Sequence, residues 1–207
     1  MKPPAKESPA PVGSMTVSSG NAGSEKKRSP TNSAAPYSPC LATITPGPLD
    51  ITERDALVEA IGNVDLVFMN DAEVRMLTQE PNLVRAARKV MEMGPGVVVA
   101  KQGEYGAALF YGDRFFALPA YPLETVKDPT GAGDSFAGGF LGYLAGHNGS
   151  TSAQDPMVLR RAMTYGSVLA SYNVEEFGTE RVRRLTRDEI DERFSEFRRM
   201  TIFDEPS

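Results

Sequence analysis

Two short apolar runs restrict what this chain can fold into more than any other feature. "VDLVFM", residues 64–69, and "VVVAK", residues 97–101, are rich in β-branched residues and too short for buried helices. Between them, residues 82–94 place apolar side chains at helical spacing and stop at a glycine. A strand, a helix and a second strand in this order predict neighbouring parallel strands joined by a crossover helix. The pattern therefore indicates an α/β fold.

The chain after residue 50 continues this alternation. A hairpin is predicted around Gly112-Asp113, a two-residue turn with glycine first. The last expected helix opens with Thr186 and Glu189 at the spacing of a capping box. The expected helices outside the crossover cover residues 51–62, 135–146, 155–174 and 186–200. In such layered folds, ligands bind beyond the carboxyl ends of the parallel strands.

Residues 1–49 have a different composition. They contain nine of the sixteen prolines, many small polar residues and only scattered apolar ones. Such a segment buries too little apolar surface to offset the entropy of ordering it. We expect residues 1–49 to be a disordered Pro/Ser-rich tail, and residues 50–207 to form the globular part.

Charge and composition exclude several classes of protein. The net charge of −5 argues against a nucleic-acid partner. One cysteine and one histidine exclude an internal disulfide and a Cys/His zinc site. No apolar run is long enough to cross a membrane or to form the core of a signal peptide. We therefore expect no membrane partner and, by default, a cytoplasmic location.

The glycine-rich stretch "DPTGAGDSFAGGF", residues 128–140, precedes an expected helix. A helix start exposes backbone N–H groups that attract anions, and small residues let a phosphate approach closely. Asp134 is then either a favourable first-turn carboxylate or a base held beside a bound phosphate. The stretch is not a P-loop, because no Gly-Lys-Ser/Thr follows. A glycine turn that leads into a tightly packed helix is the alternative.

Asn70 directly follows the first apolar run, and Glu73 lies three residues later on the same helical face. At a strand end, these side chains could orient water molecules on Mg²⁺. They could equally form a capping box, with Asn70 as N-cap and Glu73 as its partner. The local sequence alone favours capping.

Lys101 ends the second apolar run and opens "KQGEYGA", residues 101–107. Gly103 and Gly106 permit a tight turn and close backbone approach, and the lysine supplies a point charge for phosphate. A hairpin with a solvated lysine is an equally good interpretation of this segment alone.

Together, these segments resemble the ribokinase (PfkB) family of carbohydrate and nucleoside kinases. The family signature D-T-x-G-A-G-D is similar to residues 128–134, with Pro129 in place of the usual threonine. The family's N-x-x-E motif matches residues 70–73, and its K-x-G-x-x-G-A element matches residues 101–107. The three motifs agree in order and spacing, and the resemblance covers about residues 60–200.

The resemblance implies a ribokinase-like three-layer sandwich with a mostly parallel sheet. It implies ATP and Mg²⁺ as cofactors and a sugar or nucleoside as acceptor. A monovalent cation also belongs to the family pattern, although Pro129 alters the loop concerned. The implied site residues are Asp134 as catalytic base, the amides of Gly131, Ala132 and Gly133 as an anion hole, Asn70 and Glu73 acting on Mg²⁺ and phosphate, and Lys101, Gly103 and Gly106 lining the ATP side.

The same resemblance implies that the N-terminal α/β half and the small β-sheet lid, which hold the acceptor, have no counterpart in residues 1–49. We expect residues 50–207 to be the C-terminal part of such a kinase domain. Three hypotheses follow. The chain is a PfkB-type kinase; or it is a non-catalytic nucleotide-binding or regulatory module; or it completes its site with a separate N-terminal half, or within a homo-oligomer.

Overall fold

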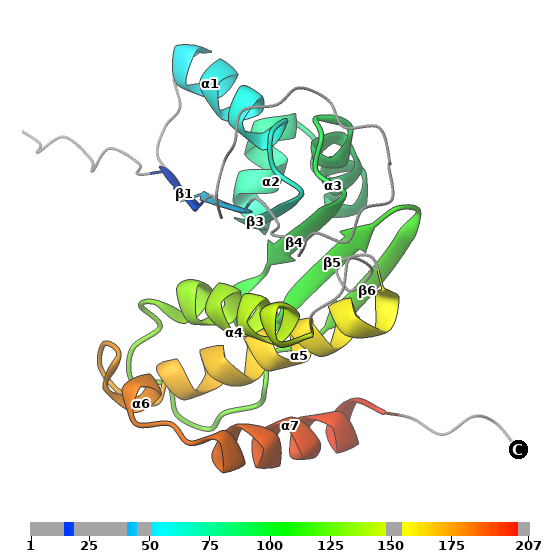
Figure 1. Ribbon diagram of the computed structural model, residues 1–207. Helices are drawn as coiled ribbons and strands as arrows, with labels where there is room; N and C mark the ends of the chain where they lie inside the picture. The colour runs from blue at the N-terminus through cyan, green and yellow to red at the C-terminus, as the bar shows by residue number, and fades with distance from the viewer. Residues whose placement is uncertain (1–14, 19–40, 45–50, 148–154, 203–207) are drawn as a thin grey trace, which may run out of the picture.

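The computed structural model describes residues 15–18, 41–44, 51–147 and 155–202, and it shows one sheet with helices on both faces (Figure 1). The strands are β1 (Met15–Ser18), β2 (Leu41–Ile44), β3 (Leu66–Asn70), β4 (Val97–Lys101), β5 (Ala107–Tyr111) and β6 (Arg114–Leu118). They lie in the order β1-β2-β3-β4-β5-β6.

The sheet is mixed rather than mostly parallel. β2, β3 and β4 are parallel to one another, while β1, β5 and β6 each run antiparallel to their inner neighbour. The connections explain the difference. A single 3₁₀ turn, η1 (Gly103–Tyr105), joins β4 to β5, and the two residues Gly112-Asp113 join β5 to β6. Links this short cannot cross over the sheet, so they reverse the chain.

Strands β1 and β2 lie inside residues 1–49, where we expected none. Leu41–Ile44 pairs in parallel with the edge of β3, and Met15–Ser18 pairs with Leu41–Ile44. Four-residue strands leave little periodic signal in a sequence, and their pairing is decided by the sheet edge that receives them. The rest of residues 1–49 lies outside the described residues, so a domain boundary after residue 49 stays a prediction.

The expected helices are confirmed, with ends shifted by a few residues. They are α1 (Ile51–Ile61), α2 (Asp71–Thr78), α3 (Leu83–Glu92), α4 (Ala132–Gly146), α5 (Pro156–Asn173), α6 (Glu180–Arg183) and α7 (Arg187–Thr201). The main shift concerns α4, which begins at Ala132 instead of residue 135. Asp134 is therefore in the first turn of the helix. The capping box of Thr186 and Glu189 at the start of α7 is also confirmed.

Alternate residues of each central strand enter two separate cores, as buried strands require. On one face, Val67 and Met69 pack with side chains from α1, α2 and α3. On the other face, Leu66 and Phe68 pack with side chains from α4, α5 and α7. The molecule thus has the three layers that we expected.

Helices α4 and α5 lie unusually close together because glycines face each other in their contact. A methyl group built on Gly139 would lie 2.8 Å from the Tyr165 carbonyl oxygen, and one on Gly166 would lie 2.8 Å from the Phe136 carbonyl oxygen. This tight packing confirms the small-residue helix expected from the sequence. It also fixes the start of α4 against the end of α5.

Candidate functional site

The sheet register brings the sequence motifs together at one edge. Asn70, at the end of β3, is the direct register partner of Lys101, at the end of β4. Lys101 is in turn paired with Ala107, the first residue of β5. The N-x-x-E and K-x-G-x-x-G-A segments are therefore neighbours at the carboxyl ends of the parallel strands.

Asn70 and Glu73 form a complete capping box at the start of α2. The Glu73 amide donates to Asn70 Oδ1 at 2.7 Å, and the Asn70 amide donates to Glu73 Oε2 at 2.6 Å. Asn70 Nδ2 also donates to Glu73 Oε1 at 2.6 Å. The capping interpretation is thus confirmed. Both oxygens of Glu73 are oriented by Asn70, so any action on a metal ion would use their remaining lone pairs.

Burial strains the charges of this strand edge. Glu73 is only 3 % exposed, and burial raises the pKa of its carboxyl above the usual value, against the Asn70 hydrogen bond and the Lys101 charge. Burial likewise lowers the pKa of the Lys101 ammonium, while the charges of Glu73 and Asp134 oppose the change. Lys101 is thus partly desolvated. Within the described residues it forms no ion pair within 4 Å.

The start of α4 faces Lys101. A methyl group at Gly133 would lie 2.8 Å from Lys101 Nζ, so only glycine leaves room for the lysine side chain as it stands. Gly131 is the N-cap in a left-handed conformation, with φ 78°, and no side chain caps the helix. The Ala132 amide donates to the Pro129 carbonyl at 3.2 Å, which closes the turn. Asp134 is exposed on this first turn. The structure thus juxtaposes a cation, an uncapped helix start and a carboxylate.

Asn173 was missed by the sequence reasoning. It ends α5, is 1 % exposed, and donates from Nδ2 to the Thr130 carbonyl at 2.7 Å. Ser135 Oγ donates to Asn173 Oδ1 at 3.0 Å. The available signal was a polar residue at the end of an apolar helix, which usually indicates only a cap.

Gly103 and Gly106 differ in what they do. Both have left-handed backbones, with φ 59° and 100°. A methyl group on Gly106 would lie 2.1 Å from the Leu118 carbonyl oxygen, whereas one on Gly103 would meet nothing within 4 Å. Close contact with the end of β6 therefore explains Gly106 without a ligand. Gly103 keeps open space beside Lys101 in the chain.

The described residues contain no group of three or more His, Cys, Asp or Glu side chains arranged to hold a metal ion. Among the helices in the described ranges, none is long and apolar enough to pass through a bilayer.

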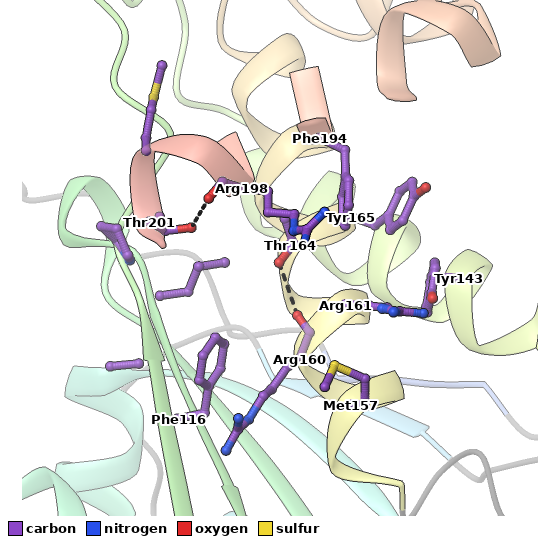
Figure 2. Close-up of a pocket in the computed structure, with 14 residues that line it drawn as sticks. Phe116, Tyr143, Met157, Arg160, Arg161, Thr164, Tyr165, Phe194, Arg198 and Thr201 are labelled. Atoms are coloured by element: carbon purple, nitrogen blue, oxygen red, sulfur yellow. Dashed lines mark hydrogen bonds between the residues drawn. The ribbon is translucent and has the colours of Figure 1, made fainter. Parts of the chain in front are cut away.

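A separate groove of about 650 Å³ lies between β6, α5 and α7 (Figure 2). Figure 2 shows Arg160 beside Phe116 and Arg161 extending toward Tyr143, so these two guanidinium groups diverge. None of the site residues predicted from the sequence lines the groove. It is therefore distinct from the strand-edge site.

A family model described as pfkB family carbohydrate kinase matches residues 40–184, which is most of the described part of the chain. The chain belongs to this family. The match begins at residue 40, before the residue near 60 at which our resemblance began, and it includes β2.

Curated relatives have kinase names. The chain is 43 % identical to a cytidine kinase of Thermococcus kodakarensis over 99 residues, covering 46 % of this chain and 35 % of that protein. It is 35 % identical to a nucleoside kinase of Methanothermobacter thermautotrophicus over 133 residues, covering 64 % of this chain and 38 % of that protein. The chain thus spans little more than a third of the length of either relative.

Solved structures confirm the ribokinase-like fold. An aminoimidazole riboside kinase from Salmonella enterica, complexed with its riboside and an ATP analog, matches with a TM-score of 0.59 at 22 % identity, covering 68 % of this chain and 46 % of that one. Ribokinase from Thermotoga maritima matches with a TM-score of 0.55 at 22 % identity, covering 67 % and 44 %. At these identities the likeness establishes the fold alone.

Proposed function

We propose that this chain carries the ATP-phosphate and catalytic side of a PfkB-type kinase, which transfers phosphate from ATP to a hydroxyl group of a nucleoside or sugar. The observation that carries the proposal is the contact of Lys101 Nζ with Gly133 at an uncapped helix start. A helix start with free N–H groups and a desolvated ammonium beside it suits a phosphate group. Family membership supplies the reaction class.

In this proposal the start of α4 stabilises the transferred phosphoryl group. The amides of the first turn face charge that develops on the phosphoryl oxygens, and Gly133 lets them approach because it has no side chain. Since the Ala132 amide already donates to Pro129, we assign the anion hole chiefly to Gly131 and Gly133. Lys101 balances the phosphate charge. Gly103 keeps the neighbouring turn open on the ATP side, whereas Gly106 shapes that turn.

Asp134 is the proposed base. It is exposed on the first turn of α4, three residues after the left-handed Gly131 and one residue after the contact with Lys101. It would take the proton of the acceptor hydroxyl as that oxygen bonds to the γ-phosphorus and ADP leaves. Phosphoryl transfer depends mainly on positioning and on charge stabilisation, and this arrangement supplies both on the phosphate side.

Mg²⁺, when bound with ATP, would neutralise charge on the phosphate oxygens. Asn70 and Glu73 fit an indirect role, because their capping hydrogen bonds hold the Glu73 carboxylate at the strand edge. Mg²⁺ commonly keeps several water ligands, which suits a carboxylate that acts through water. A monovalent cation stays part of the proposal on the resemblance alone.

The acceptor class is proposed from the relatives. The two named above are a cytidine kinase and a nucleoside kinase, so a nucleoside is the first acceptor to test. These names describe proteins that this chain matches over little more than a third of their length. An acceptor-binding half supplied separately, or by a second copy, therefore belongs among the assemblies to assay.

The alternative function is a nucleotide-binding or regulatory module without catalysis. The exposed Asp134 beside Lys101 favours the kinase, because a module that only binds phosphate has no use for a carboxylate close to the phosphate. Both proposals require the chain to bind Mg·ATP.

Isothermal titration of the full chain with Mg·ATP, followed by phosphotransfer assays with cytidine, adenosine, ribose and fructose, tests the proposal. We expect ATP binding that is weakened by Lys101→Met and unchanged by Arg88→Met on α3. Phosphotransfer is expected once an N-terminal half from a related kinase is added, and the chain alone should give at most slow ATP hydrolysis. Binding without transfer in any assembly would favour the regulatory module. No binding at all would contradict both proposals.

A further inference from the structure

We propose that Asn173 is a positioning residue, which fixes the turn before α4 and thereby aims the first-turn amides and Asp134 at the substrate phosphate. This role rests on the proposed phosphate site at the start of α4. It assigns a task to a residue that the family motifs in this sequence do not include.

The first observation is the way in which Asn173 is bonded. Its carboxamide donates to the Thr130 carbonyl at 2.7 Å and accepts from Ser135 Oγ at 3.0 Å. One bond reaches the residue before the N-cap Gly131, and the other reaches the first turn of α4. A carboxamide is suited to this task because it offers a donor and an acceptor at once, whereas a carboxylate only accepts. Asn173 thus grips the helix start from both sides.

The second observation is that little else holds this turn. No side chain caps α4, and Gly131 has a left-handed backbone that other residues rarely adopt. A methyl group at Gly131 would lie 3.5 Å from Asn173 Nδ2, so the carboxamide lies directly against the N-cap. Because the helix-start amides are left for a ligand, their direction depends on a group that binds the carbonyl and hydroxyl side of the same turn.

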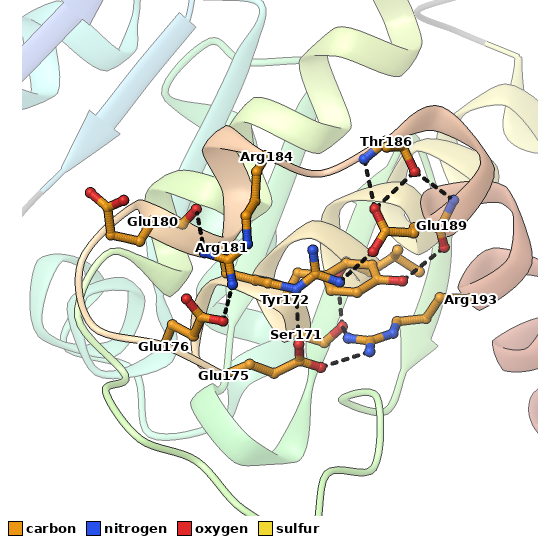
Figure 3. Close-up of polar contacts among 11 residues, drawn as sticks. Ser171, Tyr172, Glu175, Glu176, Glu180, Arg181, Arg184, Thr186, Glu189 and Arg193 are labelled. Atoms are coloured by element: carbon orange, nitrogen blue, oxygen red, sulfur yellow. Dashed lines mark hydrogen bonds and ion pairs between the residues drawn. The ribbon is translucent and has the colours of Figure 1, made fainter.

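The third observation is that Asn173 is itself held firmly. Its neighbour Tyr172 donates its hydroxyl to the Glu189 carbonyl at 2.8 Å (Figure 3). The guanidinium carbons of Arg193 and Arg181 lie 3.4 Å and 4.6 Å from the centre of the Tyr172 ring. Backbone bonds add to this, since the Lys127 amide donates to the Val174 carbonyl at 2.8 Å. The end of α5 is therefore a rigid support for the turn.

The test compares Asn173→Asp and the milder Ser135→Ala with Asn63→Ala in the full chain. Asn63 is a matched control, because its side chain also bonds a helix-end carbonyl, that of Glu59 at 2.8 Å, but next to α1. Two readouts are needed. Amide NMR signals of Gly131, Gly133 and Asp134, recorded without nucleotide, report the position of the turn. Titration with Mg·ATP, together with the thermal unfolding midpoint, reports its effect on binding.

We expect Asn173→Asp to move the amide signals of residues 131–134 more than those of other segments, and to weaken Mg·ATP binding about tenfold, the usual scale for one hydrogen bond and its unpaired partner. Ser135→Ala should move the same signals less, and Asn63→Ala should leave both readouts unchanged. If Asn173→Asp fails to fold, Ser135→Ala decides.

Positioning is overturned if the signals of residues 131–134 stay in place, or if ATP affinity falls no more than in an equally destabilised Asn63 variant. If the unmodified chain binds no ATP, the proposed function fails, whereas the NMR comparison still decides whether Asn173 holds the turn.

Discussion

The strand edge and the helical corner use charged residues in opposite ways. In the helical corner, formed by α6, the end of α5 and the start of α7, the arginines are paired: Arg181 with Glu175 and Glu189, and Arg193 with Glu175. At the strand edge, the partly buried Lys101 has only the more distant charges of Glu73 and Asp134. The corner satisfies its charges internally, and the edge leaves them available.

This difference separates groups that stabilise the fold from groups that can serve a ligand. Charges that are paired and hydrogen-bonded have little left to offer to a substrate, and removing one of them leaves its partner unpaired. A desolvated charge without a close partner costs stability, and it persists where function uses it. The following predictions test whether the two regions differ in this way.

The largest effect is expected from Asp134→Asn at the strand edge. The amide keeps the shape of the side chain but cannot accept the proton of the acceptor hydroxyl. In a catalytically competent assembly we expect kcat to fall at least about a hundredfold, the scale of general base catalysis, with little change in stability. Asp113→Asn, in the exposed β5–β6 turn, is the matched control. Near-normal kcat in the Asp134 variant would remove Asp134 from the mechanism.

Arg193→Met should show the opposite behaviour of the corner. Arg193 donates to Ser171 Oγ at 3.0 Å, pairs with Glu175 at 2.6 Å and lies over Tyr172. Removing it leaves a partly buried Glu175 without one of its two partners. We expect the free energy of unfolding to fall by about 2–3 kcal/mol, measured by urea denaturation. The exposed Arg199→Met should change it by less than about 0.5 kcal/mol. Equal losses in both variants would show that the corner is not a stabilising unit.

Lys101→Met sharpens the contrast, because it should separate binding from stability. Methionine fills similar space without the desolvated charge, so the free energy of unfolding should stay equal or increase. The affinity for Mg·ATP should fall about tenfold through loss of a charge-assisted contact. Calorimetric titration and thermal unfolding of the same samples give both values. A loss of stability with unchanged affinity would place Lys101 among the structural charges.

The smallest effect is a pH dependence that belongs to the corner. The Thr186 amide, the Arg181 guanidinium and the Thr186 hydroxyl lower the pKa of Glu189 to about 2 from its ordinary 4.5. A lowered carboxyl pKa stabilises the fold at pH values above 4.5, and this contribution is lost as the pH falls from about 4.5 to 2. Glu189→Gln should flatten the unfolding midpoint in that window. Burial raises the pKa of Glu73, so Glu73→Gln should not flatten it in the same way. Identical profiles for all three proteins would contradict the assignment.

Most of the fold followed from periodicity. The runs at 64–69 and 97–101 predicted β3 and β4, and the spacing of the helices predicted three layers. The mixed sheet was missed, because strand direction depends on the length of each connection and not on strand composition. Strands β1 and β2 were missed because four residues are too few for alternation to stand out from a Pro-rich background.

The sequence alone determined which residue types stand at strand ends and helix starts: Asn70, Lys101 and the glycines before Asp134. Their local roles follow from short-range physics, such as capping and backbone freedom, which a motif encodes directly. Only the tertiary structure decided that Lys101 lies against Gly133, that Gly106 contacts the end of β6, and that Asn173 grips the start of α4. These contacts join residues from 12 to 43 positions apart. They depend on register and helix packing, which no local pattern specifies.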